Sequence, residues 1–387
     1  MRKHLLLLGF TAIVVSLILG LRYNVAHAQQ GQVVPAPSSI QSMDVCGDSI
    51  SKAFNGQSTF PCPNQDQEQY NWATSVTHGE ELCTAGPEGV YSQAERIECL
   101  KRANIIALSP NSAESGAQML KDFVNQAQSV RARLALQPSP RYVPILLGHN
   151  DLCGGTVWKF SFGCERGSDQ NPSNYCRTTM AAFERELRKG LDLLITLDDT
   201  HVGVASMVRV SQLCNHGAKV NCQTFTTCRN VWASAAYFGW IFGSNNGICG
   251  SLTANCSDTR IRDAYQTAKA YRDVLQRVAA EYAAIVPGAT SRVVAVGGEI
   301  VGGAVKAPGV SIAYSDAPWR YKLTSASLNC CDCFHPSRQG QNVAARVLFE
   351  GLTCTATEPC CRDTGDPLVD GRCMVTDTDG RFYGGLF

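Results

Sequence analysis

Short apolar segments alternate with long amphipathic helices along the middle of this 387-residue chain, and this alternation restricts the fold more than any other feature. Helices are predicted at 114–136, 174–194 and 259–284, where apolar residues recur at spacings of three, four or seven, and a last one at 337–350. The expected strands are 45–49, 104–108, 142–147, 202–210 and 292–296. Because such apolar strands are buried on both faces, the pattern predicts a parallel sheet covered by helices on both sides.

The composition divides the chain into four parts. Residues 1–28 are predicted to be a secretory signal, with a basic start, an apolar run at 5–21 and small residues at 26–28. We expect 29–42 to be a linker, 43–353 the main domain and 354–387 a cysteine-rich tail that needs disulfides to hold its shape. These features predict a secreted or periplasmic protein. An uncleaved membrane anchor is the alternative, because the apolar run has 17 residues, near the lower limit for a spanning helix.

The cysteine content indicates an oxidising compartment. All 19 cysteines follow residue 28, which predicts a disulfide framework whose pairing cannot be deduced from spacing. Because 19 is odd, at least one thiol is free, pairs with another chain or has a function. Five cysteines lie in residues 212–258, which are predicted to be a disulfide-braced insertion. The net charge of +1 creates no field that would attract nucleic acid, and the sequence leaves the oligomeric state open.

Three short motifs carry residues suited to acyl transfer: Gly-Asp-Ser-Ile at 47–50, Gly-His-Asn-Asp at 148–151 and Asp-Cys-Phe-His at 332–335. Ser49 is the candidate nucleophile, and a serine hydroxyl needs a base at neutral pH. His335 is the candidate base, because Asp332 can accept from its Nδ1 and leave Nε2 free for the serine proton. Asn150 can direct a side-chain N–H at the developing oxyanion. The first two motifs follow strand candidates, where sites in parallel sheets form.

These motifs resemble those of the SGNH or GDSL-type esterases and lipases. The segments 47–50, 148–151 and 332–335 resemble the first, third and fifth sequence blocks of that family, and their context is most similar to the phospholipase B-like branch. The resemblance spans about 44–350. It implies a three-layer α/β/α fold with a mainly parallel, flavodoxin-like sheet, and a reaction that needs no cofactor.

The resemblance also assigns roles to residues of this chain. It implies that Ser49 is the nucleophile, His335 the base and Asp332 its orienting acid. It further implies an oxyanion hole formed by the backbone N–H of Ser49, by Asn150 and by a glycine of the second block, for which Gly79 is the candidate.

Other residues near the motifs have both a functional and a structural interpretation. Asp48 and His149 are candidate substrate contacts, although Asp48 also suits a helix cap or a loop tie, and His149 occupies a variable position of its block. Trp232 and Trp240 belong to an aromatic run at 231–242 and are candidate substrate contacts as well. That run is expected to form an acyl-binding wall or a lid that touches a lipid surface, with ordinary packing of the insertion as the alternative.

The cysteines at 330, 331 and 333 lie beside His335 and raise the question of a zinc site. Their spacing lacks the usual C-x2-C pairing, and the compartment favours disulfides, so we expect no metal and a disulfide that pins the His335 loop.

Together these residues predict a secreted serine hydrolase that cleaves carboxylic esters through an acyl-enzyme on Ser49. Lipid or phospholipid acyl esters are favoured as small-molecule substrates, and the insertion 212–258 is expected to determine the choice. A carbohydrate O-acetylesterase of the same fold is one alternative. A non-catalytic secreted binding module is an alternative of a different class.

Overall fold

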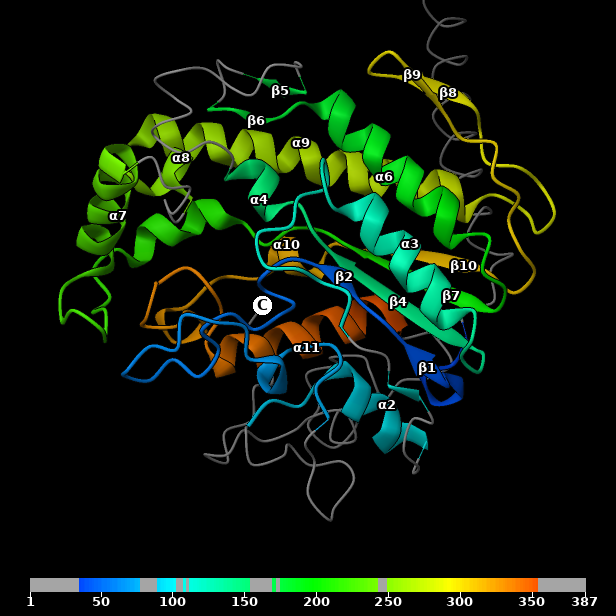
Figure 1. Cartoon of the computed structure of the whole chain (residues 1–387), viewed down its shortest axis with the longest axis horizontal. Coiled ribbons are helices and arrows are strands. Elements are labelled where there is room, and N and C mark those ends of the chain that lie inside the picture. The colour runs from blue at the N-terminus through cyan, green and yellow to red at the C-terminus, as the bar shows by residue number, and fades with distance from the viewer. Residues whose placement is uncertain are drawn as a thin grey trace, which may run out of the picture.

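A parallel sheet forms the centre of the molecule (Figure 1). The computed structural model describes residues 35–76, 89–101, 107–108, 111–153, 169–171, 175–242 and 249–353. The strands of the central sheet are β1 (Ser42–Met43), β2 (Cys46–Gly47), β3 (Ala107–Leu108), β4 (Arg141–Leu146), β7 (Thr200–Ala205) and β10 (Ser311–Ser315). Neighbouring strands in this sheet are parallel throughout.

The chain adds strands first toward one edge of the sheet and then toward the other, and this reversal falls between β1 and β4. The order is β3-β1-β4-β7-β10, and β2 pairs with β4 in the same register as β1, so β1 and β2 act as one interrupted strand. In chain order this is 2-1-3-4-5, the order of flavodoxin-like sheets. Ligands bind such sheets beyond the carboxyl ends of the strands at the reversal, which here are β2 and β4.

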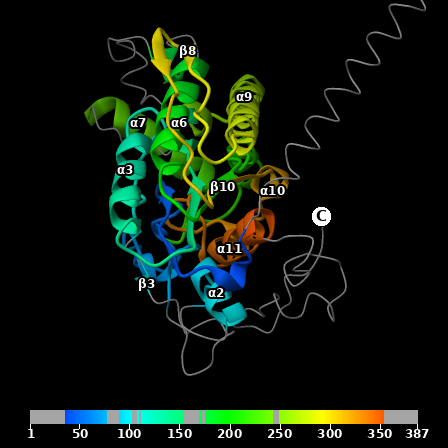
Figure 2. The same cartoon turned by 90° about the vertical axis from the view of Figure 1, so that its right-hand side faces the viewer.

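Helices cover both faces of the sheet, which confirms the predicted α/β/α class (Figures 1 and 2). The longer helices are α2 (Gln93–Lys101), α3 (Phe123–Leu134), α6 (Met180–Leu194), α7 (Cys228–Phe242), α9 (Asp258–Ala283) and α11 (Arg338–Thr353). The shorter ones are α4 (His149–Leu152), α8 (Gly250–Thr253) and α10 (Ala317–Arg320), with 3-10 turns η1 (Pro37–Ser39), η2 (Glu68–Tyr70), η4 (Val210–His216) and η5 (Ser325–Ser327). Helices α3, α6 and α9 lie side by side on one face, and α2 and α11 lie on the other.

Alternate residues of β4 show how the sheet separates two apolar cores. Val143 and Ile145 pack into the core beneath α3, α6 and α9, whereas Tyr142 and Leu146 pack into the core beneath α2 and α11. Successive side chains of a strand point to opposite faces, so the consecutive apolar residues of β4 serve both cores. None of the helices in the described part of the chain combines the length and the apolar content that a membrane span requires.

Polar caps determine where two of the long helices begin. The hydroxyl of Thr179 accepts the N–H of Ala182 at the start of α6, and the hydroxyl of Ser257 accepts the N–H of Arg260 at the start of α9. Such caps satisfy backbone donors that have no partner within the helix. The prediction for α9 was within one residue at each end. Helix α6 begins six residues later than predicted, because the strand β6 (Arg177–Thr178) occupies the start of that segment. β6 pairs with β5 (Gln170–Asn171).

The helix predicted to start at 114 starts instead at Phe123. Residues 114–122 form turns, because the carboxylate of Asp151 accepts the N–H groups of Met119 and Leu120 that a helix would use internally. Gly116 also has φ +86°, which a helix does not permit. The apolar periodicity of this segment thus predicts a helix correctly from residue 123 onward, whereas residues 114–122 are held as turns by Asp151.

The strand predicted at 292–296 is not part of the central sheet. β8 (Val294–Val296) and β9 (Glu299–Val301) form a separate antiparallel hairpin, and Gly297 and Gly298 at its turn both have positive φ. The fifth sheet strand is β10, which follows the hairpin and was not predicted. Ile40, in the segment expected to be a linker, is fully buried, so the folded part of the chain begins before residue 43.

The insertion 212–258 is braced by disulfides, as predicted. Five disulfides join pairs of described cysteines: Cys62–Cys331, Cys153–Cys249, Cys214–Cys256, Cys222–Cys330 and Cys228–Cys333. One of them joins the two ends of the insertion, and the others that involve it reach the rest of the chain. Among the described cysteines Cys46 is a free thiol, and burial holds its pKa well above the usual value, so it is not a reactive group. The expected signal at 1–28 and tail at 354–387 lie outside the described residues.

Candidate active site

The side chains of Ser49, His335 and Asp332 form one chain of hydrogen bonds. His335 Nε2 lies 2.7 Å from Ser49 Oγ, and His335 Nδ1 lies 2.8 Å from Asp332 Oδ2. Ser49 is in the turn that follows β2, at the reversal of the sheet, and the other two residues are in the loop before α11. In this arrangement a carboxylate fixes the imidazole in its Nδ1–H tautomer, and Nε2 faces the hydroxyl.

Both carboxylate oxygens of Asp332 are fully used. Oδ1 accepts the backbone N–H groups of Phe334 and His335, each at 2.9 Å. Oδ2 accepts the side-chain amide of Asn55 at 2.9 Å in addition to His335. Burial alone would raise the pKa of Asp332, but the charge of His335 and these hydrogen bonds prevail and lower it to about 2. The carboxylate is therefore ionised at neutral pH.

Aromatic rings fix the plane of the His335 imidazole. The ring of Phe54 lies 4.9 Å from it at an interplanar angle of 48°, and the ring of Phe334 lies 5.0 Å from it at 81°. These edge and tilted contacts are favourable for aromatic rings and leave the line between Nε2 and Ser49 open. The imidazole is thus held by packing on its faces and by hydrogen bonds at both nitrogens.

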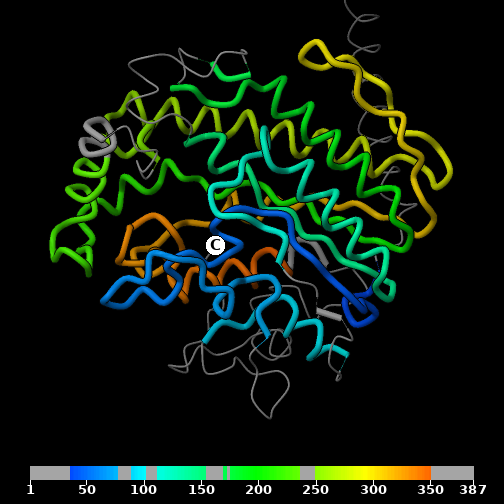
Figure 3. Tube along the Cα trace, viewed as in Figure 1, coloured from blue at the N-terminus to red at the C-terminus, as the bar shows by residue number. Residues whose placement is uncertain are grey.

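Three disulfides fix the loop that carries Asp332 and His335 (orange in Figure 3). The prediction that cysteines pin this loop is confirmed, and three are involved: Cys330 to Cys222, Cys331 to Cys62 and Cys333 to Cys228. Cys333 has φ +60°, a conformation that costs free energy in a residue with a side chain and persists only where neighbours impose it. The bond to Cys228, at the start of α7, is such a constraint.

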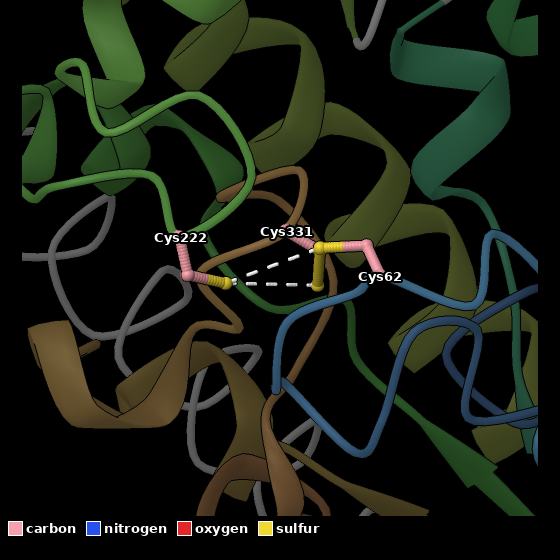
Figure 4. A group of neighbouring side chains, drawn as sticks. All are labelled: Cys62, Cys222 and Cys331. Carbon is pink, nitrogen blue, oxygen red and sulfur yellow. Dashed lines mark hydrogen bonds between the residues drawn. A yellow bond between two sulfur atoms is a disulfide. The ribbon is translucent and has the colours of Figure 1, made fainter.

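The sulfurs of Cys62, Cys222 and Cys331 lie together beside this loop (Figure 4). Cys222 Sγ is 3.9 Å from Cys62 Sγ and 3.8 Å from Cys331 Sγ. All three sulfurs are in disulfides, as is Cys333, so they cannot serve as the thiolate ligands that a zinc site requires. The cluster is a contact between two neighbouring disulfides.

Asn150 follows β4 and lies at the same edge of the sheet as Ser49. The side-chain amide of Asn150 donates one hydrogen to the carbonyl of Ala117 at 2.9 Å. The side chain of Gln118 donates to the backbone carbonyl of Asn150 at 3.1 Å. The amide has a second hydrogen, and none of the described residues accepts a hydrogen bond from the backbone N–H of Ser49. Gly79, the third expected donor, lies outside the described residues.

Asp151 is buried and organises the turn against which Asn150 is held. Its carboxylate accepts the N–H groups of Met119 at 2.6 Å and Leu120 at 3.2 Å, and the hydroxyl of Thr178 at 2.7 Å. Burial, only partly offset by these bonds, raises its pKa to about 6. Since Ala117 lies just before the turn, Asp151 supports the carbonyl that orients the Asn150 amide.

The two candidate contacts Asp48 and His149 form a buried pair. His149 Nδ1 lies 3.0 Å from Asp48 Oδ2, and neither side chain is more than 1% exposed. Asp48 is thus placed as a tie between loops, the structural interpretation given above. His149 does line an apolar pocket, which is described next.

An apolar cavity of about 60 Å³ lies beside the Ser49–His335 pair. Its walls come from three parts of the chain: the segment after β7, the segment from α10 to η5, and α11. Ile50, Phe334 and Pro336, which are sequence neighbours of Ser49 and His335, are among the residues that line it. The remaining lining residues are Leu146, His149, Val208, Val210, Leu213, Pro318, Tyr321, Leu323, Ser327, Leu328, Gly340, Val343, Ala344, Val347 and Leu348.

None of the described side chains of the aromatic run lines this cavity. Trp232 is fully buried in the core, and its indole N–H donates to the backbone carbonyl of Asp332 at 3.1 Å. It matches the packing alternative and supports the loop of the triad from behind. Trp240 lies in α7, and its side chain is outside the described residues. Among the described residues of the insertion, Leu213 alone lines the cavity.

Two supporting roles around Asp332 were missed in the sequence, that of Asn55 and that of Trp232. Asn55 shares Asp332 Oδ2 with His335, and Trp232 holds the Asp332 carbonyl. Asn55 carries no local signal of this role, because its partner is 277 positions away and no pattern of spacing connects them. The position of Asn55 becomes evident only when the two loops are brought together.

The family comparison agrees with this fold and geometry. The chain belongs to the family of GDSL-like lipases and acylhydrolases, whose model matches residues 45–348. The match begins one residue before β2 and ends within α11, so it includes every strand of the central sheet after β1. The protein is therefore a hydrolase of the esterase or lipase type. A comparison with curated proteins finds no match.

Proposed function

We propose that this protein is a serine-dependent carboxylic ester hydrolase with Ser49 as nucleophile, His335 as general base and Asp332 as the acid that orients the imidazole. The observation that carries the proposal is the hydrogen-bond chain from Asp332 through His335 to Ser49, with distances of 2.8 and 2.7 Å. A serine hydroxyl becomes an effective nucleophile only when a base removes its proton in the same step.

The reaction proceeds in two halves. Ser49 Oγ attacks the acyl carbonyl carbon while its proton passes to His335 Nε2, and the carbonyl oxygen becomes an oxyanion. The Ser49 N–H and the second amide hydrogen of Asn150 stabilise that charge, with Gly79 as the proposed third donor. The tetrahedral species then expels the alcohol, which takes the proton from His335. Water, deprotonated by the same imidazole, releases the acid from the acyl-enzyme. Asp332 stays ionised throughout, as its low pKa requires.

The substrate class we propose is an ester with an extended acyl chain, such as a lipid or phospholipid acyl ester of the kind cleaved by the phospholipase B-like branch. The apolar cavity supports this choice, because its lining includes Ile50 and Phe334, the sequence neighbours of Ser49 and His335. An apolar chain gains free energy on leaving water in proportion to the area that it buries. A carbohydrate ester would need a polar groove, whereas most of the residues that line this cavity are apolar, which argues against a carbohydrate O-acetylesterase.

The test is a Ser49→Ala variant assayed on aryl esters from acetyl to long-chain acyl. We expect kcat to fall by about 10³-fold or more on every ester, and a serine-reactive phosphonate to label Ser49 in the unaltered protein alone. Ser139→Ala is the matched control, since this serine is exposed and lies before β4, at the opposite end of that strand from Asn150. Unchanged turnover in Ser49→Ala would exclude the assignment, and the absence of both turnover and labelling in the unaltered chain would favour a binding module.

We also infer that the chain is exported. Disulfides across the active-site loop need an oxidising compartment to form, and the first 28 residues have the composition of a secretory signal. Amino-terminal sequencing of the protein recovered from a secreting host tests this, with Gln29 as the expected first residue. A chain that keeps residues 1–28 would point to the uncleaved anchor.

A further inference from the structure

His149 connects three loops at the carboxyl edge of the sheet. Its Nδ1 lies 3.0 Å from Asp48 Oδ2, and its Nε2 accepts the backbone N–H of Val208 at 3.1 Å. The second oxygen of Asp48 accepts the backbone N–H of Ile50 at 2.9 Å. The connected segments are the nucleophile turn after β2, the turn after β4 that carries Asn150, and the loop after β7.

The contacts of His149 specify one tautomer. A backbone N–H can only donate, so Nε2 must carry the lone pair that accepts from Val208. The ring proton is then on Nδ1, where it points at the Asp48 carboxylate. A neutral imidazole in this tautomer makes two directional bonds on opposite sides of the ring. No aliphatic side chain of similar volume reproduces both.

The position of the ring in the sequence gives these bonds a mechanical consequence. Asp48 directly precedes Ser49, and His149 directly precedes Asn150. The turn that carries His149 has little freedom of its own, because Gly148 has φ +118° and a Cβ there would meet Met207 and Phe183. A change in the Asp48–His149 bond would therefore move the nucleophile relative to the oxyanion donor.

We propose that His149 is a positioning residue, which acts through Asp48 to hold Ser49 and Asn150 in the mutual geometry that the acyl-transfer step needs. The inference rests on the proposed function, since it assigns those two residues their roles. His149 lies between the glycine and the asparagine of the motif at 148–151, and this positioning role differs from the substrate contact that the sequence indicated. Displacement of a reacting group by about 1 Å is enough to cost about 10²-fold in rate.

The chain offers a matched control in a second buried histidine. His201 lies on β7 and is also fully buried; its Nδ1 is 2.9 Å from Ser311 Oγ, and its ring stacks on Tyr142 at 5.7 Å. His201 pairs in register with Tyr142, four residues before the carboxyl end of β4, and its bond to Ser311 and its stacking on Tyr142 lie within the sheet. Replacing His201 thus removes a buried imidazole without changing the link between Ser49 and Asn150.

The experiment compares His149→Gln, His149→Ala and His201→Gln in the full mature protein, using a short-chain aryl ester, phosphonate labelling and thermal unfolding. For both His149 variants we expect kcat and the rate of phosphonate labelling to fall together by about 10- to 100-fold, with KM changed less than about threefold. His201→Gln is expected to lower Tm but to leave kcat within about twofold. If His149→Ala does not fold, His149→Gln carries the test.

Two further measurements separate positioning from structural support. Because His149 borders the apolar cavity, added imidazole can enter the space left in His149→Ala, and we expect it to restore kcat about tenfold there but not in His149→Gln. In a double-mutant cycle, Asp48→Asn and His149→Gln together should lose no more kcat than the worse single variant, because both break one link. Loss of Tm with unchanged kcat, or multiplicative losses in the cycle, would overturn the inference. Such a result leaves the proposed function intact, which fails only if Ser49→Ala retains turnover.

Discussion

Asn55 and Asp332 are 277 positions apart in the sequence, yet the amide of Asn55 donates to the same Oδ2 atom of Asp332 that binds His335. Oδ2 therefore receives two donors, and the hydrogen bond of Asn55 is one of the interactions that lower the pKa of Asp332 to about 2. A bond of this kind keeps the carboxylate ionised and its orientation fixed without contacting Ser49, the proposed nucleophile.

Asn55→Ala is expected to raise the pKa of Asp332 and to lower kcat by about tenfold, because the carboxylate loses a donor and some of its orientation. A carboxylate whose pKa is depressed by folding contributes stability above the unfolded value of 3.8, and this stability is lost as the pH falls through the folded value. In the variant that loss begins at a higher pH. Acid unfolding followed by near-ultraviolet circular dichroism measures the shift.

Asn230→Ala is a suitable control for this prediction, because Asn230 is exposed and bonds only to the neighbouring turn at Thr226 and Thr227. Equal acid-unfolding midpoints for Asn55→Ala and the unaltered protein would contradict the role given to Asn55.

A second titration concerns Asp151, whose buried carboxyl has a pKa raised to about 6. A group with a raised folded pKa contributes stability that is fully present below its unfolded value of 3.8 and is lost as the pH rises through about 6. That interval corresponds to about 3 kcal/mol. The amide introduced by Asp151→Asn does not titrate. From pH 4 to pH 7 the unaltered protein should therefore lose unfolding free energy relative to this variant, by an amount of this order. Denaturant unfolding at both pH values checks it, and a constant difference would show that Asp151 does not titrate there.

The closeness of Ser49 and Asn150 could be predicted from the sequence, because parallel strands bring their carboxyl ends to one edge. Ser49 follows β2 and Asn150 follows β4, and these strands are paired, so two motifs far apart in the chain had to lie close together. The fold class could be predicted from the alternation of short apolar segments with amphipathic helices along the chain. His335 depended on its motif, since no strand pairing locates the loop before α11.

Other features depend on contacts that periodicity does not encode. Strand β10 is an edge strand with Ile312 as its one large aliphatic residue. The valine-rich segment at 292–296 has high strand propensity but forms a hairpin outside the sheet. The apolar cavity is made by segments from three regions, so no single stretch of sequence marks it. The aromatic run around Trp232 attracted attention for its composition, but a fully buried tryptophan with a hydrogen-bonded N–H is a core residue.

The disulfides around the triad predict an effect on turnover as well as on stability. Replacing Cys222 and Cys330 together by alanine removes a bond next to Asp332, so we expect kcat to fall at least about tenfold, along with Tm. The matched control is the double replacement of Cys214 and Cys256, whose disulfide joins the two ends of the insertion. That variant should lose Tm but keep kcat. Equal kcat values for the two double variants would indicate that the disulfide at Cys330 does not help to position the loop.

The apolar cavity predicts how acyl length and rate are related. Ala344 lies on α11 and faces the cavity, so Ala344→Phe fills part of the space without replacing any residue of the triad. Long acyl esters should lose about 10- to 100-fold in kcat/KM, because each methylene kept out of the cavity forfeits about 0.8 kcal/mol of burial. Acetyl esters, which need none of this space, should change by less than about threefold and serve as the internal control. The measurement is kcat/KM against acyl length in both proteins. Parallel profiles would mean that the acyl chain binds elsewhere, and an equal loss on every ester would mean that the substitution had disturbed α11 and the loop before it.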